Sequence, residues 1–191
     1  MKTVLITAAL LAAALLLTGC DNPTADHAAE KGAVVRPTAA SDADGIELVP
    51  ISYKEWTQKL AGYPPEIVVV DMWATWCAPC IERFPKMVEL HKKYGDRGVR
   101  FVSMNLDSRE DKPALKMAEQ FLINTGASFE NYLMNENLLE AFEMLDLLGI
   151  PTVLVYGPDG QERFRLTGDN PNSQFTDRDI ESAIETLLAQ R

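Results

Sequence analysis

One stretch decides how this sequence is interpreted, namely residues 67–80, Ile67-Val-Val-Val-Asp-Met-Trp-Ala-Thr-Trp-Cys-Ala-Pro-Cys80. Its first half is a continuous apolar run rich in β-branched residues, which is typical of a strand buried on both faces of a sheet. The run contains one acid, Asp71, and the stretch ends in Cys77 and Cys80 with two residues between them. These cysteines form a structural staple, a metal site or a reaction centre, and the rest of the chain discriminates among the three.

The staple and the metal site are weak interpretations. Closing so short a loop contributes only about 2 kcal/mol in the chain-entropy model, and a chain of 191 residues forms an adequate core without it. A zinc site needs further soft ligands, but His27 lies in a segment without ligand partners and His91 is expected on the outer face of a helix. A c-type haem attachment requires His directly after the second cysteine, where Ile81 stands. We therefore expect no metal and no cofactor.

The position of the cysteines between a predicted strand and a predicted helix favours a reaction centre. The pattern changes from strand to helix near Cys77, so this cysteine is predicted at a helix N-terminus, where free N–H groups and the helix dipole favour the thiolate. We expect Cys77 to attack a substrate disulfide and Cys80, one turn further in and more buried, to resolve the mixed disulfide. Trp76 flanks the nucleophile and is either a contact for a partner polypeptide or a partly exposed packing residue.

Asp71 is the most informative residue after the cysteines. An acid inside a valine-rich strand is costly unless it has a partner or a task. Burial raises the pKa of a carboxyl group, which makes Asp71 a candidate acid–base near neutral pH. The alternative is an Asp that faces a polar rim of the sheet.

The remaining pattern alternates between helical and strand signals. We expect helices at 52–60, 78–94, 112–124, 137–148 and 176–189, and strands at 67–72, 99–106, 129–134, 152–156 and 162–166. This order predicts the α/β class, with a mixed central sheet and helices on both faces.

The paired motifs of the chain resemble the thioredoxin superfamily. They are Val-Asp-x-Trp-Ala-x-Trp-Cys-x-Pro-Cys, followed by Pro85, and the later Gly149-Ile-Pro-Thr152 before a strand. Together with an N-terminal pattern over residues 1–45 that is typical of an export signal and a tether, and an extra strand–helix segment between about Lys112 and Asn137, they make the chain most similar to membrane-anchored TlpA/ResA-like disulfide reductases. The resemblance covers Leu48 to the C-terminus and implies a thioredoxin fold with that segment inserted.

The resemblance also implies roles for individual residues. Asp71 would lie beneath the disulfide and transfer protons for Cys80. The lysine that often accompanies this acid in thioredoxins would fall at Ser103, so that partner is missing here. A second set of residues would line the substrate groove, with a cis peptide bond before the proline: Ile150, Pro151 and Thr152.

The N-terminal residues predict export. Lys2 precedes an apolar run that ends in Leu17-Thr-Gly-Cys20, which is a signal-peptide pattern over residues 1–19. Its ending resembles the bacterial lipobox, after which the cysteine is acylated, although a plain signal peptide that leaves a cysteine is the alternative. We expect a lipidated Cys20 and flexible tether over 20–45, a thioredoxin-like domain over 46–191, and an envelope protein that is anchored to a membrane and faces the periplasm.

These patterns together predict an exported thiol–disulfide oxidoreductase. Its expected partners are protein disulfide and dithiol substrates, the membrane through the lipid on Cys20, and a membrane electron donor. Reduction or exchange is favoured over oxidation, because Ala78-Pro79 adds no stabilisation to a thiolate. The formal net charge of -10 argues against sequence-independent nucleic-acid binding. The alternatives are a non-catalytic thioredoxin-fold binding module and a thiol peroxidase, whose Pro, Thr and Cys spacing matches neither Cys77 nor Cys80.

Overall fold

The computed structural model describes residues 45–169 and 174–191, all within one compact unit of the chain. The predicted signal peptide, Cys20 and all but the last residue of the predicted tether lie outside the described residues. Among the described residues, no helix is both long enough and apolar enough to cross a bilayer.

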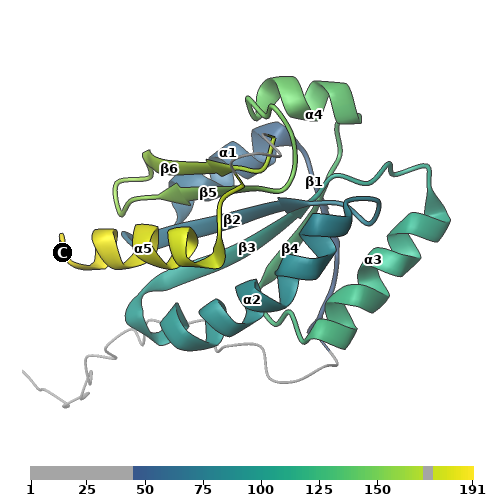
Figure 1. Ribbon diagram of the computed structural model, residues 1–191. Helices are drawn as coiled ribbons and strands as arrows, with labels where there is room; N and C mark the ends of the chain where they lie inside the picture. The colour runs from purple at the N-terminus through teal and green to yellow at the C-terminus, as the bar shows by residue number, and fades with distance from the viewer. Residues whose placement is uncertain (1–44, 170–173) are drawn as a thin grey trace, which may run out of the picture. The chain divides into compact units, whose positions relative to one another are not determined.

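A mixed sheet of six strands forms the middle of the described part (Figure 1). The elements in chain order are β1 (Val49–Ile51), α1 (Tyr53–Gly62), β2 (Ile67–Trp73), α2 (Ala78–Tyr94), η2 (Gly95–Arg97), β3 (Val99–Asn105), α3 (Lys112–Thr125), β4 (Glu130–Met134), α4 (Leu138–Met144), β5 (Thr152–Tyr156), β6 (Glu162–Thr167) and α5 (Asp177–Leu188). The strand order is β1-β4-β3-β2-β5-β6; β1, β4, β3 and β2 pair in parallel, whereas β5 is antiparallel to both β2 and β6. The predicted α/β class is confirmed, and α3 with β4 forms the predicted inserted segment, β4 lying between β1 and β3.

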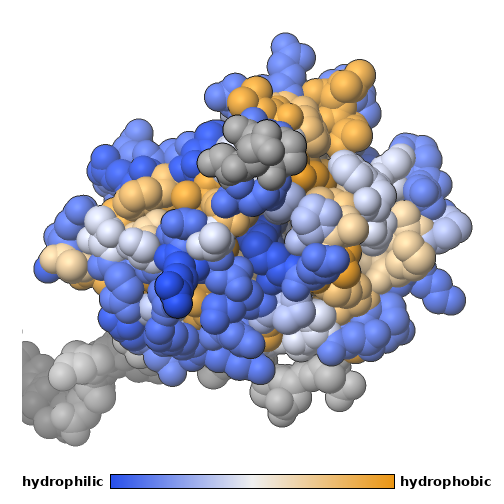
Figure 2. Space-filling model, in the orientation of Figure 1, coloured by the Kyte–Doolittle hydropathy of each residue, from blue (hydrophilic) through white to orange (hydrophobic). Residues whose placement is uncertain are grey.

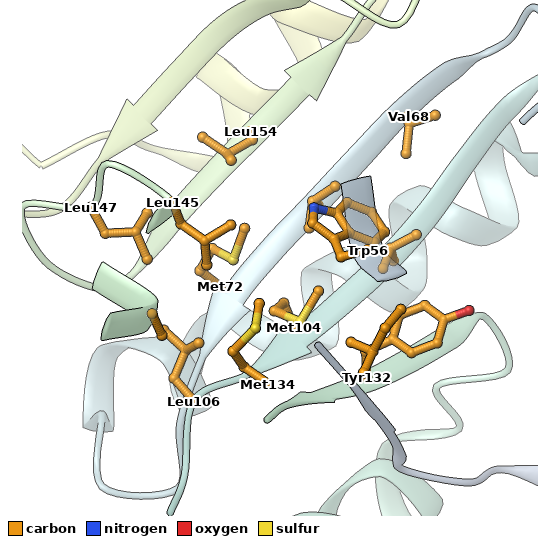
Figure 3. Close-up of a cluster of buried hydrophobic side chains, with 14 residues drawn as sticks. Trp56, Val68, Met72, Met104, Leu106, Tyr132, Met134, Leu145, Leu147 and Leu154 are labelled. Carbon is orange, nitrogen blue, oxygen red and sulfur yellow. The ribbon is translucent and has the colours of Figure 1, made fainter. Parts of the chain in front are cut away.

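Strand β2 separates two layers of core. All of its residues are buried because β3 and β5 pair with its edges and helices cover its faces. Side chains alternate along a strand, so Val68, Val70 and Met72 pack on one face with Trp56 of α1 (Figure 3). The opposite face, which carries Asp71, packs against α2 and α5.

Two local predictions differ from the structure. Strand β1 was not predicted, because three residues with only Ile51 buried show no periodic pattern. The helix expected over 137–148 ends at Met144, and the chain turns at Asp146, whose φ is 52°. The Arg165 guanidinium donates to the carbonyls of Leu145 and Asp146 at 3.1 and 2.9 Å. This contact satisfies carbonyls that a longer helix would have bonded internally.

Candidate functional site

The two cysteines lie where β2 passes into α2. Cys77 is the N-cap residue of α2, and its backbone carbonyl accepts hydrogen bonds from the N–H groups of Cys80 and Ile81 at 3.0 and 3.1 Å. Pro79 occupies the first turn of the helix, where a missing N–H costs nothing. Cys77 and Cys80 form a disulfide with their Cα atoms 5.3 Å apart. The predicted place of Cys77 at a helix N-terminus is confirmed.

The surroundings of the disulfide are asymmetric. Cys80 is fully buried and Cys77 is 5% exposed, whereas the neighbouring Trp76 is 56% exposed. The first turn of α2 contains no acidic residue, so no carboxylate there opposes the partial positive charge of the helix N-terminus. The exposed surface next to the disulfide therefore lies on the side of Cys77 and Trp76.

The loop that carries Trp76 is held by a carboxylate. Asp107 lies just beyond β3 and is buried, and its oxygens accept from the Thr75 N–H at 2.9 Å and the Thr75 hydroxyl at 2.8 Å. The side-chain amide of Asn105 donates to the same carboxylate at 2.8 Å. This role of Asp107 was not predicted from the sequence, although a polar residue directly after a buried strand is a signal for it.

Asp71 is buried and paired with a cation. Its Oδ1 accepts a hydrogen bond from Arg83 Nη2 at 2.6 Å, and the two side chains are 1% and 10% exposed. Burial raises the pKa of the Asp71 carboxyl group, and the Arg83 charge opposes that rise. The alternative placement of Asp71 at a polar rim is wrong. The position where many thioredoxins have a lysine carries no charge here. It is Ser103, which pairs with Asp71 in the β2–β3 register and whose hydroxyl donates to the Asn131 side chain.

Sequence reasoning missed Arg83. Its position three residues after Cys80 places both side chains on one side of α2, which is the signal that was present. Only the structure shows which face of α2 packs on the sheet, and that packing brings Arg83 into contact with Asp71.

The segment 149–152 lies at the same edge of the sheet as the disulfide. The Ile150–Pro151 peptide bond is cis, and Ile150 packs against the cluster that contains both cysteines. Thr152 pairs with Met72 of β2. The Thr152 side chain is buried and donates to the Gly149 carbonyl at 2.7 Å. Its side chain therefore holds the loop from inside and does not face solvent.

Exposed apolar side chains gather near this edge. Leu148, two residues before Ile150, is 78% exposed. Figure 2 shows hydrophobic surface over α4, where Leu138, Leu139 and Met144 are exposed.

The described residues contain no group of three or more His, Cys, Asp and Glu side chains placed to hold a metal ion. The expectation of His91 on the outer face of α2 is also wrong. Its ring is half-buried, edge-on to Phe101 and Phe129 with centroids 5.7 and 5.3 Å away. Burial lowers the pKa of His91.

Comparisons with known proteins agree with this geometry. The family model described as Thioredoxin matches residues 47–121. The thiol-disulfide oxidoreductase ResA of Bacillus subtilis is 30% identical over 111 residues, which are 58% of this chain and 58% of that protein. The protein of the same name from Geobacillus kaustophilus is 28% identical over 159 residues, or 83% of this chain and 81% of the relative. A solved thiol:disulfide interchange protein from Chlorobium tepidum, a thioredoxin family protein, superposes with a TM-score of 0.52 at 23% identity, covering 69% of this chain and 84% of that one. The structural likeness shows a thioredoxin fold.

Proposed function

We propose that this chain is a thiol–disulfide oxidoreductase of the thioredoxin superfamily that acts through Cys77 and Cys80; the family model over residues 47–121, the ResA relatives and the fold support this. The observation that carries the proposal is the disulfide whose first cysteine caps the N-terminus of α2 while its second is fully buried. The names of the two ResA relatives support the same activity.

The reaction follows from the difference between the two cysteines. In the reduced protein the Cys77 thiolate attacks a substrate disulfide, forms a mixed disulfide and releases one substrate thiolate, which takes up a proton. The Cys80 thiol then loses its proton and attacks Cys77 Sγ, which releases the second substrate thiol and forms the Cys77–Cys80 bond. The substrate gains two electrons, and the protein dithiol loses them.

Reduction or exchange is the favoured direction. Strong oxidants of this kind stabilise their reduced thiolate, which makes their disulfide reactive. Ala78 and Pro79, the residues between the cysteines, offer neither charge nor a side-chain donor for that purpose. A membrane protein would supply electrons to the oxidised pair.

We place the substrate backbone beside the cis peptide bond that precedes Pro151. Ile150 and Trp76 would contact the extended chain on either side of Cys77. Support comes from the packing of Ile150 against the cysteine cluster and from the exposure of Trp76.

Disulfide reduction by the purified full chain tests the activity. With dithiothreitol as electron source and insulin as substrate, the wild type is expected to speed reduction and Cys77→Ser to abolish the effect. Cys80→Ser is expected to accumulate a mixed disulfide with the substrate, because no resolving thiol remains. The proposal fails if Cys77→Ser keeps full activity. Binding of insulin by the wild type without any exchange would identify the non-catalytic binding module instead.

Export and anchoring are proposed from the pattern of residues 1–20. In a bacterial host supplied with labelled fatty acid, the wild type is expected to carry label and to sediment with membranes. Cys20→Ser is the matched variant and is expected to lose the label while its redox activity is kept. Equal labelling of both chains would exclude Cys20 as the acylated residue.

A further inference from the structure

Arg83 is a buried cation beside the cysteine pair. It follows Cys80 by three residues on α2, and such residues are neighbours on a helix surface, with Cβ atoms about 5–6 Å apart. Its guanidinium bonds Asp71 at 2.6 Å, and its central carbon lies 4.8 Å from the centroid of the Phe175 ring. The cation is thus enclosed between the helix that carries both cysteines and the strand that carries the acid.

The Arg83–Asp71 ion pair leaves buried polar atoms of both side chains without a hydrogen-bond partner among the described residues. A guanidinium commonly holds a carboxylate through two parallel hydrogen bonds, whereas one is formed here. Asp71 Oδ2 is buried and has no hydrogen-bond partner among the described residues, and the same holds for Arg83 Nε and Nη1. A purely structural ion pair gains from satisfying these atoms. A carboxylate that accepts and returns a proton needs one free oxygen.

The other elements around Asp71 bring no charge to it. Ser103 faces it from β3 and Val153 from β5. From α5, the side chains that pack on this face of the sheet are apolar: Ile180, Ala183, Ile184 and Leu187. Burial acts to raise the pKa of Asp71, and the one opposing charge among the described residues is Arg83.

We propose that Arg83 is a positioning residue of the dithiol site, which holds Asp71 ionised and in place to accept the proton of the Cys80 thiol. The inference rests on the proposed function. In the resolving step, the S–H bond of Cys80 breaks and its proton passes to Asp71, while the Cys80 sulfur forms the bond to Cys77 Sγ. The substrate sulfur leaves with the bonding electron pair, and the proton is returned from Asp71 to that thiolate or to water. No further oxidant or reductant is consumed in this step.

Removing the Arg83 charge is expected to raise the pKa of Asp71. Without Arg83, burial alone acts on Asp71, so its pKa rises further and less carboxylate is present near neutral pH. An opposite charge at this distance shifts a carboxyl pKa by about 1–3 units. The resolving step is therefore expected to need a higher pH, whereas the first attack by Cys77 is not.

The two steps separate in a reaction with an aromatic disulfide reagent that releases a coloured thiol. The full chain carrying Cys20→Ser is reduced and mixed with 5,5′-dithiobis(2-nitrobenzoate) in a stopped-flow instrument across a range of pH. Attack by Cys77 releases one coloured thiolate and resolution by Cys80 the second. In Arg83→Met the pH midpoint of the second phase is expected to rise by at least about 1 unit, and in Arg83→Lys to return towards the wild type.

Two further variants test whether Arg83 acts on the resolving step through Asp71. Lys86→Met removes the same charge from a partly exposed position of α2, where Lys86 pairs with Glu89, and is expected to leave both phases unchanged. Asp71→Asn combined with Arg83→Met removes both buried charges, and its second phase is expected to match that of Asp71→Asn alone. Arg83→Gln replaces Arg83→Met if the latter does not fold.

The outcomes are distinct. An unchanged midpoint in folded Arg83→Met or Arg83→Gln overturns the proposal, since Arg83 then serves stability alone. A shift of equal size when Asp71 is already Asn also overturns it, because the cation would then act on Cys80 directly. Absence of the first phase in the wild type would refute the proposed function itself.

Discussion

Replacement of Asp107 by alanine gives a sharp test of how the loop before Cys77 is held. Its carboxylate accepts three hydrogen bonds, two from Thr75 and one from the Asn105 amide, at 2.8–2.9 Å. Hydrogen bonds to charged groups contribute about 1.5–3 kcal/mol each, and bonds that share one acceptor group are not additive. The Thr75 N–H and the Asn105 amide would lose their acceptor, and the Asn105 side chain is buried. We expect Asp107→Ala to lower the free energy of unfolding by about 3–5 kcal/mol.

Equilibrium unfolding in urea measures this loss. Thr75→Val is the matched control, because it removes one of the three bonds and keeps the size of the side chain; its expected cost is about 1–2 kcal/mol. Since Thr75 is two residues from Cys77, Asp107→Ala is also expected to slow the first attack on a disulfide. A loss below about 1 kcal/mol, or equal losses in the two variants, would refute the assignment of Asp107 as the anchor of this loop.

Two further predictions concern stability. Because burial lowers the pKa of His91 below its ordinary 6.5, the unfolded chain binds this proton more readily. Stability is therefore lost as pH falls through and below 6.5, and the drop in melting temperature from about pH 7.5 to about pH 5 should be smaller in His91→Leu; an equal drop would contradict this. Ser52→Ala removes the capping box of α1, formed with Glu55, and should cost about 1 kcal/mol in urea unfolding, whereas Lys54→Ala on the exposed face should cost less than half of that.

The parts of the fold that were predicted correctly are those with a strong local signal. Strand β2 was expected within one residue of its observed end, because its run of apolar β-branched residues allows no amphipathic helix. Helix α2 was expected at its observed bounds, since Cys77-Ala-Pro marks its start and Gly95 follows its end. The burial of Asp71 followed from its place inside the same run.

The parts that were missed depend on contacts distant in space. Residue spacing shows that Arg83 and Cys80 share a side of α2, but the angle at which α2 lies over the sheet decides whether that side meets Asp71. The carbonyls that follow the early end of α4 are bonded by Arg165, which lies 20 residues beyond Leu145. Neither contact can be inferred from local sequence propensity, because each joins elements that come together only on folding.

The cation paired with Asp71 comes from helix α2 and not from the neighbouring strand β3. A lysine at the position of Ser103 would belong to β3 and would act on Asp71 whatever the position of α2. Arg83 instead belongs to the helix that carries both cysteines, one turn beyond Cys80. A shift of α2 on the sheet therefore changes the distance from Asp71 to the thiol and to the cation together. If Asp71 serves the resolving thiol as proposed, the influence of Arg83 on that carboxylate therefore depends on the position of α2 over the sheet.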